Sequence, residues 1–81
     1  MDEDLSYKTI RKAVVNLYSE VHFAYKDKYY WIAYYKNGVH LSDDEGNTQY
    51  FNDAQSLFDR ATIEGKNLEE IWDEIEVDSV S

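Results

Sequence analysis

The sequence predicts a single acidic α+β domain over residues 1–81, built from an N-terminal helix, an antiparallel meander of three or four strands and two short C-terminal helices. Three observations support this fold class. Apolar residues recur at helical spacing near the N-terminus, four aromatic and β-branched segments follow, and helix-capping residues then open two more apolar stripes. No repeat or Gly/Ser/Pro linker divides the chain.

The first helix is expected over residues 6–20, beginning at Ser6. Apolar residues recur there every three or four positions, as they do on the buried side of an amphipathic helix. The members of this stripe are Ile10, Ala13, Val14, Leu17, Tyr18 and Val21. Lys8, Arg11, Lys12 and Asn16 fall on the opposite side, which we expect to face water.

The meander is expected from four segments rich in aromatic and β-branched residues, at 22–25, 29–35, 39–41 and 48–51. Asn37 and Gly38 are the strongest local signal, because both tolerate the positive φ that a two-residue type I′ turn requires. This turn would place Tyr34 opposite Leu41, and it would fix the register of the two strands beside it.

The other two turns complete the predicted faces of the sheet. We expect a tight turn at Asp27 and Lys28, and a four-residue loop over residues 44–47. Because side chains alternate along a strand, one face is then the core. It consists of Phe23, Tyr25, Tyr30, Ile32, Tyr34, Val39, Leu41 and Tyr50. The opposite face consists of Trp31, Ala33, Tyr35, His40 and Ser42.

Two interpretations of the Trp31 face stay open. In one, the first helix packs over it, so that the domain has three layers and the aromatic residues are structural. In the other, Trp31, Tyr35 and His40 are partly exposed and bind a protein, since large aromatic side chains supply interface hot spots. A nucleic-acid stacking platform of Tyr29, Trp31 and Tyr35 is disfavoured by the net charge of −9, although Lys26, Lys28 and Lys36 flank these residues.

The C-terminal part is expected to hold two helices. Asn52 is a predicted N-cap for a helix over residues 53–61. Asn67 and Glu70 have the spacing of a capping box for the next helix. The inner stripe of this third helix would be Leu68, Ile71, Trp72 and Ile75. The chain is expected to fray from Asp78 onward.

The sequence offers little for catalysis. Without cysteine there is no disulfide, thiolate zinc site or cysteine nucleophile. His22 and His40 belong to no metal-binding motif. A calcium loop beginning at Asp43 would need glycine at its sixth position and glutamate at its twelfth, but Gly46 is fourth and Ala54 is twelfth. No glycine-rich phosphate loop is present. We therefore expect a non-enzymatic protein with no metal and no cofactor.

The charge is concentrated in the second half. Seventeen acids face eight Lys and Arg in the whole chain, and residues 43–81 hold twelve of the acids against Arg60 and Lys66. This charge argues against direct binding of nucleic acid or an anionic membrane. A hydrophobic content of 43% excludes a disordered acidic tail. The acidic start and the lack of a long apolar run predict neither signal peptide nor membrane span, hence a cytoplasmic protein.

The third predicted helix carries acids and no base. Glu69 and Asp73 are four residues apart, so on one helix this pair would repel by about 0.2–0.5 kcal/mol. Carboxylates at this spacing lie about 6 Å apart, close to the phosphate spacing along a nucleic-acid strand. The sequence thus predicts a surface that binds a basic protein partner. Its main contacts would be Glu69, Glu70, Asp73, Glu74 and Glu76, with Asp43, Asp44 and Glu45 as a second cluster.

In size, acidity, absence of cysteine and layout, the chain resembles the small phage-encoded inhibitors that imitate nucleic acid, including some anti-CRISPR proteins. The run of residues 68–76 and the acids at 43–45 carry this resemblance. It implies a non-catalytic blocker of a nucleic-acid-binding protein. The alternative is a general protein-interaction or homodimerisation module that uses Trp31, Tyr35 and His40.

Overall fold

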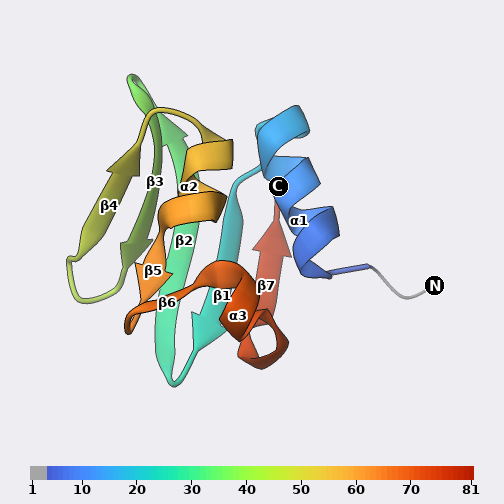
Figure 1. The fold of residues 1–81 in the computed structure, drawn as a ribbon, viewed down its shortest axis with the longest axis vertical. Helices are drawn as coiled ribbons and strands as arrows, with labels where there is room; N and C mark the ends of the chain where they lie inside the picture. Colours follow the sequence, from blue (N-terminus) through green and yellow to red (C-terminus); the bar gives the residue numbers. More distant parts are fainter. Residues whose placement is uncertain (1–3) are drawn as a thin grey trace.

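The computed structural model describes residues 4–81, so most of the acidic start that we interpreted in the sequence lies outside the described residues. The fold is α+β, as predicted (Figure 1). Its elements are α1 (Tyr7–Leu17), β1 (Val21–Tyr25), β2 (Lys28–Tyr35), β3 (Gly38–Asp43), β4 (Thr48–Phe51), α2 (Ala54–Arg60), β5 (Thr62–Ile63), β6 (Lys66–Asn67), α3 (Leu68–Ile71), the 3-10 helix η1 (Trp72–Glu74) and β7 (Glu76–Val80).

The strands form one five-stranded antiparallel sheet and one small hairpin. The order in the main sheet is β4-β3-β2-β1-β7, and β5 pairs only with β6. The meander of β1 to β4 confirms the prediction. The strand β7 and the β5–β6 hairpin were not predicted.

The helices cover one face of the main sheet (Figure 1). From that inner face the Tyr34 hydroxyl donates a 2.6 Å hydrogen bond to the Val14 carbonyl of α1. The Phe23 ring lies 6.1 Å from the Trp72 ring of η1. The sheet contributes Val21, Phe23, Tyr25, Tyr30, Ile32, Val39 and Leu41 to the core. The structure therefore has two layers, with its core between the helices and the inner face.

Helix α1 begins as predicted and ends earlier. The Ser6 hydroxyl accepts a hydrogen bond from the Thr9 N–H, which makes Ser6 the N-cap. The helix stops at Leu17 because Tyr18 turns into the left-handed region, with φ of 55°. Leu17 and Tyr18 are each 73% exposed. Their predicted place in the inner stripe was wrong, because Leu17 is the last residue of α1 and Tyr18 already lies beyond the helix.

The first two tight turns each lie one residue earlier than predicted. The β1–β2 turn is formed by Lys26 and Asp27, both with positive φ. The β2–β3 turn leaves Tyr35 opposite Gly38, so the predicted type I′ turn at Asn37 and Gly38 was wrong. Moving a two-residue turn by one position shifts the register by two residues, which keeps every side chain on its face. The predicted core positions of β1, β2 and β3 are therefore retained.

Glycine was predicted at position 38 for the positive φ of a type I′ turn, but in the structure it is required for space. A Cβ atom there would lie 2.2 Å from the Phe51 carbonyl oxygen, at the end of β4. Glycine is thus needed because two backbones approach each other closely.

The third turn changes the face of the strand that follows it. Its loop has three residues, 44–46, because the Asp43 N–H donates a 3.0 Å hydrogen bond to the Asn47 carbonyl. Gly46, with φ of 90°, supplies the left-handed residue that such loops use. Shortening the loop by one residue shifts the register by one. Tyr50 consequently lies opposite His40 and is 66% exposed, so its predicted place in the core was wrong.

Helix α2 confirms the predicted apolar stripe with a different cap. Ala54, Leu57 and Phe58 are buried. The N-cap is Asp53 rather than Asn52, because the Asp53 carboxylate accepts a 2.8 Å hydrogen bond from the Ser56 N–H.

The predicted third helix is largely replaced by other structure. The capping box of Asn67 and Glu70 is present, yet α3 has only four residues before η1 follows. The chain then becomes extended and β7 pairs with β1, so the prediction that it frays from Asp78 was wrong. Hydrogen bonds of 2.7 Å and 2.9 Å between the backbones of Glu20 and Ser81 hold the strand's end. The edge of β1 that β2 leaves unpaired is the hydrogen-bonding partner of β7. The sequence around β7 does not reveal this partner, because β1 is distant in the chain.

Candidate functional site

The main predicted contacts lie in one C-terminal stretch at the end of the molecule where α3 sits (Figure 1). We name this set the acidic segment, and it consists of Glu69, Glu70, Asp73, Glu74 and Glu76. All five side chains are exposed, as predicted.

The acidic segment is not one helix. Glu69 and Glu70 belong to α3, Asp73 and Glu74 to η1, and Glu76 begins β7. A regular spacing of about 6 Å was expected between carboxylates four residues apart on one helix. That expectation does not apply here, because the backbone changes conformation between these residues. Glu70 also has an internal role, since its carboxylate accepts a 3.0 Å hydrogen bond from the Asn67 N–H. The prediction of one continuous helix for these acids was therefore wrong.

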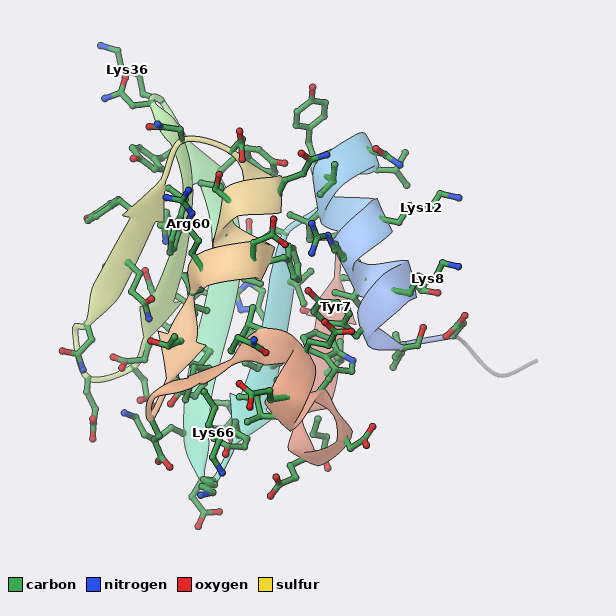
Figure 2. The ribbon with its side chains drawn as sticks, in the orientation of Figure 1. Tyr7, Lys8, Lys12, Lys36, Arg60 and Lys66 are labelled. Atoms are coloured by element: carbon green, nitrogen blue, oxygen red, sulfur yellow. The ribbon has the colours of Figure 1, made fainter. Side chains whose placement is uncertain are left out.

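The acidic segment makes no ion pair within residues 4–81. The ion pairs in that range join other acids to Arg11, His22, Lys26 and Lys28. Lys8 and Lys12 project outward from α1, and Lys36 stands at the end of the long axis opposite α3 (Figure 2). The carboxylates of the segment thus face water without a neutralising partner in the described part of the chain.

The second predicted cluster is largely engaged within the domain. Asp43 is 7% exposed, and its carboxylate accepts hydrogen bonds of 2.9 Å to 3.0 Å from Glu45 and Asn47. The side-chain hydrogen bond from Asn47, with help from the backbone N–H groups, lowers the pKa of Asp43 to about 2. Lys28 lies 2.9 Å from Glu45 and 3.4 Å from Asp43. Of the three acids, Asp44 alone is exposed without an ion pair inside residues 4–81.

The alternative site is a second surface, which meets the acidic segment at Glu76. We name the side of the main sheet that faces away from the helices the outer face. The strand register places on it His22, Ala24, Tyr29, Trp31, Ala33, Tyr35, His40, Ser42, Thr48, Tyr50, Glu76 and Ser79. The structure thus brings together the three predicted residues, Trp31, Tyr35 and His40.

No described helix covers the outer face, so the predicted three-layer alternative was wrong. Helix α1 packs on the other side, where Val14 and Tyr34 meet. Tyr29 is 59% exposed and Tyr35 is 36% exposed, while Trp31 is partly exposed. These aromatic side chains form a surface rather than a core.

Tyr29 was grouped with Trp31 and Tyr35 only in the disfavoured stacking platform, although strand alternation places it on the same face. Tyr50 was predicted to lie in the core, because the loop before it was expected to be one residue longer. In the structure its ring lies 5.3 Å from the Tyr35 ring and 6.2 Å from the His40 ring.

The lysines near the meander do not line the outer face as a phosphate-binding site would require. Lys26 pairs with Glu64 at 3.2 Å, and Lys28 lies on the inner side with the Asp43 turn. Lys36 sits in the β2–β3 turn. Stacked bases on this face would therefore find no row of cations for their phosphates.

The two histidines make local hydrogen bonds. His22 Nε2 lies 2.6 Å from Glu20, and His40 Nδ1 lies 2.7 Å from the Ser42 hydroxyl. Within residues 4–81, no group of three or more His, Cys, Asp or Glu side chains has the arrangement of a metal site. No helix in this range is long and apolar enough to cross a membrane.

No protein-family model, curated protein or solved structure matches the chain.

Proposed function

We propose that this chain is a non-catalytic acidic binding protein, which docks its acidic segment onto a basic surface of a partner protein. The observation that carries the proposal is that the ion pairs of the domain are unevenly distributed over its acids. Arg11, Lys26 and Lys28 pair with acids elsewhere, whereas five exposed carboxylates at one end of the molecule have no ion-pair partner within residues 4–81. A positively charged surface would be steered toward that end.

The partner class that fits this charge is a nucleic-acid-binding protein. Such proteins carry Lys and Arg surfaces that neutralise phosphates, and a dense display of carboxylates competes for the same surfaces. The acids occupy α3, η1 and β7, so the imitation we propose is of charge density and not of evenly spaced phosphates. By occupying the basic surface, the protein would inhibit nucleic-acid binding.

A charge-reversal experiment tests the acidic segment. The variant Asp73→Lys with Glu74→Lys should lose most of its affinity for a basic partner, because attraction becomes repulsion at the contact. The matched control, Glu20→Lys with Asp59→Lys, changes the net charge equally on other parts of the surface. Immobilised wild-type and variant proteins would capture partners from a lysate of the native host, with circular dichroism to check folding. Equal capture by the wild type and the Asp73 and Glu74 variant would contradict the proposal.

Competition with duplex DNA tests the partner class. If the partner uses its basic surface for nucleic acid, added DNA should release it from the immobilised protein. Binding should also weaken steeply as salt rises, since released counterions drive it. Capture that resists both DNA and salt would refute the nucleic-acid-mimicking inhibitor.

A second candidate function is protein interaction through the outer face. The observation that favours it is the row of exposed aromatic side chains on a sheet side that no described helix covers. Tyr and Trp are enriched at protein interfaces because they bury a large apolar area and keep a polar group at the rim.

A further inference from the structure

We infer that the outer face is a homodimer interface, in which the sheets of two copies of this chain pack against each other. The outer face shares only Glu76 with the acidic segment, and a dimer through it does not depend on the proposed function. Three properties of the outer face favour a second copy as its partner: its charge, the mutual packing of its aromatic side chains and its area.

The charge of the outer face favours a second copy. Its strand positions carry aromatic, small and hydroxyl side chains over β2, β3 and β4, whereas its acids lie at the β1–β7 side, namely Glu76 and the Glu20 carboxylate 2.6 Å from His22. A basic partner would gain little from such a face, because there are few carboxylates to meet its cations. In a chain with a net charge of −9, this is where two copies can touch with the least repulsion. A two-fold interface also matches like surface with like surface, so it needs no opposite charge.

The aromatic side chains are already ordered against one another. The Tyr35 and Tyr50 rings meet edge to face at 5.3 Å, and the His22 and Trp31 rings stack at 6.4 Å. Side chains held in this way lose less conformational freedom when a partner packs on them. A flat, ordered sheet face therefore starts with a smaller entropic penalty than a mobile surface.

The area of the face agrees with a weak dimer. Strands about 4.8 Å apart give a five-stranded sheet a width of about 20–24 Å, and eight residues of β2 extend about 26 Å. The other four strands have only four to six residues, which reduces the usable face to about 450 Å² per copy. Two copies would bury about 900 Å² in total, below the size of stable specific interfaces and within the range of weak, transient ones. We expect a dissociation constant in the micromolar range.

Part of each acidic segment would remain accessible in this dimer. Glu69, Glu70 and Asp73 belong to α3 and η1, in the helical layer, whereas Glu76 lies on the outer face and, with Glu74, lines a hollow beside Ala24 and Tyr29. If the proposed function holds, the dimer would present two acidic segments and could bind a partner with two basic sites by avidity.

Sedimentation equilibrium of the protein alone tests the inference, from low micromolar to millimolar concentration and at two salt levels. We expect a monomer–dimer equilibrium that tightens with salt, because screening weakens the repulsion between two negative chains. Binding to a basic partner has the opposite salt dependence. A monomer at every concentration and both salt levels would overturn the inference and leave the acidic-segment proposal untouched.

A pair of lysine variants locates the interface. Tyr50→Lys places a charge on the outer face and should weaken dimerisation at least about tenfold. Tyr18→Lys makes the same change in net charge at a tyrosine that is 73% exposed near the end of α1, and it should leave dimerisation unchanged. Tyr50→Ser adds no charge and should still weaken the dimer, while circular dichroism checks that each variant folds. Equal effects of Tyr50→Lys and Tyr18→Lys would overturn the inference.

Discussion

Asp43 illustrates how a residue in a strongly acidic chain can serve the fold instead of a partner. It is one of two buried polar residues within residues 4–81, and its carboxylate holds the β3–β4 loop closed. The backbone N–H of Asn47 is thereby drawn back toward Asp43, which makes the loop three residues long. Through the register, this single carboxylate also decides that Tyr50 faces outward.

The pH dependence of stability should reveal the role of Asp43. Its pKa in the folded state is about 2, below the ordinary value of 3.8, so the folded state favours the ionised form. The stability from this group is therefore fully present above pH 3.8 and is lost as pH falls through 2. In Asp43→Asn, we expect a lower melting temperature at neutral pH and a smaller further loss between pH 3.8 and 2. Thermal melts of both proteins across this range measure the difference, and parallel pH curves would contradict the assigned role.

Among the elements, the strands of the meander were predictable because alternation survives errors in turn position. Two turns were misplaced by one residue, yet Phe23, Ile32 and Leu41 remained in the core. The third turn was not predictable in this way, because its length depends on hydrogen bonds to Asp43. A one-residue change there reverses the face of β4.

The strand β7 could not be predicted because its stability comes from a distant partner. Residues 67–76 begin with a capping box and apolar residues at helical spacing, so local analysis favours a longer helix. The competing structure pairs β7 with β1, more than fifty residues earlier in the sequence. The pairing with β1 thus outweighs the local helix propensity, as tertiary contacts often do for short helices.

The candidate surfaces were predictable to different degrees. Exposure of Glu69 and Asp73 followed from the inward stripe of Leu68 and Trp72, which are buried. Whether the Trp31 face is covered was left open, because either side of an amphipathic sheet can receive helices. The helices cover the side that carries Phe23, and this choice belongs to tertiary packing.

The cap of α3 allows a test at the level of one element. Asn67→Ala removes the side chain that accepts a 2.9 Å hydrogen bond from the Glu70 N–H. We expect a loss of about 1 kcal/mol in the free energy of unfolding. For a domain of this size, this corresponds to a fall of about 4–8 °C in melting temperature. Asn52→Ala is the control, because Asn52 was a predicted cap and the cap of α2 is Asp53. Its effect should stay within about 0.5 kcal/mol, and an equal loss in both variants would contradict this assignment.

In the whole molecule, charge and aromatic surface are separated. The acidic segment lies at the α3 end, and the outer face lies on the side of the sheet away from the helices (Figure 1). Since β1 contacts both β7 and the core, one sheet carries the aromatic surface and also anchors the end of the acidic segment. Apart from Glu76, which belongs to both, residues of one surface can therefore be changed while the other remains intact.

The unbalanced charge predicts that salt stabilises the folded monomer. The molecule measures 36 × 27 × 19 Å, and the screening length is about 30 Å in 0.01 M salt and about 10 Å in 0.1 M salt. In the lower salt, carboxylates repel one another across the whole domain, whereas in the higher salt only near neighbours do. The surface ion pairs weaken as well, but exposed pairs contribute at most about 1 kcal/mol each. We expect the melting temperature to rise by several degrees between these two conditions, at protein concentrations low enough to exclude dimers.

The variant with Asp73→Lys and Glu74→Lys provides the control for this salt effect. It reduces the net charge from −9 to about −5 and places cations among the remaining acids of the segment. Its melting temperature in low salt should therefore exceed that of the wild type, and its rise with salt should be smaller. Thermal melts of the two proteins side by side measure both quantities. If carboxylates of the acidic segment repel one another, both charge reversal and salt screening must relieve that repulsion. A wild-type melting temperature that falls with salt would therefore contradict such repulsion. An equal rise in the two proteins would contradict it as well.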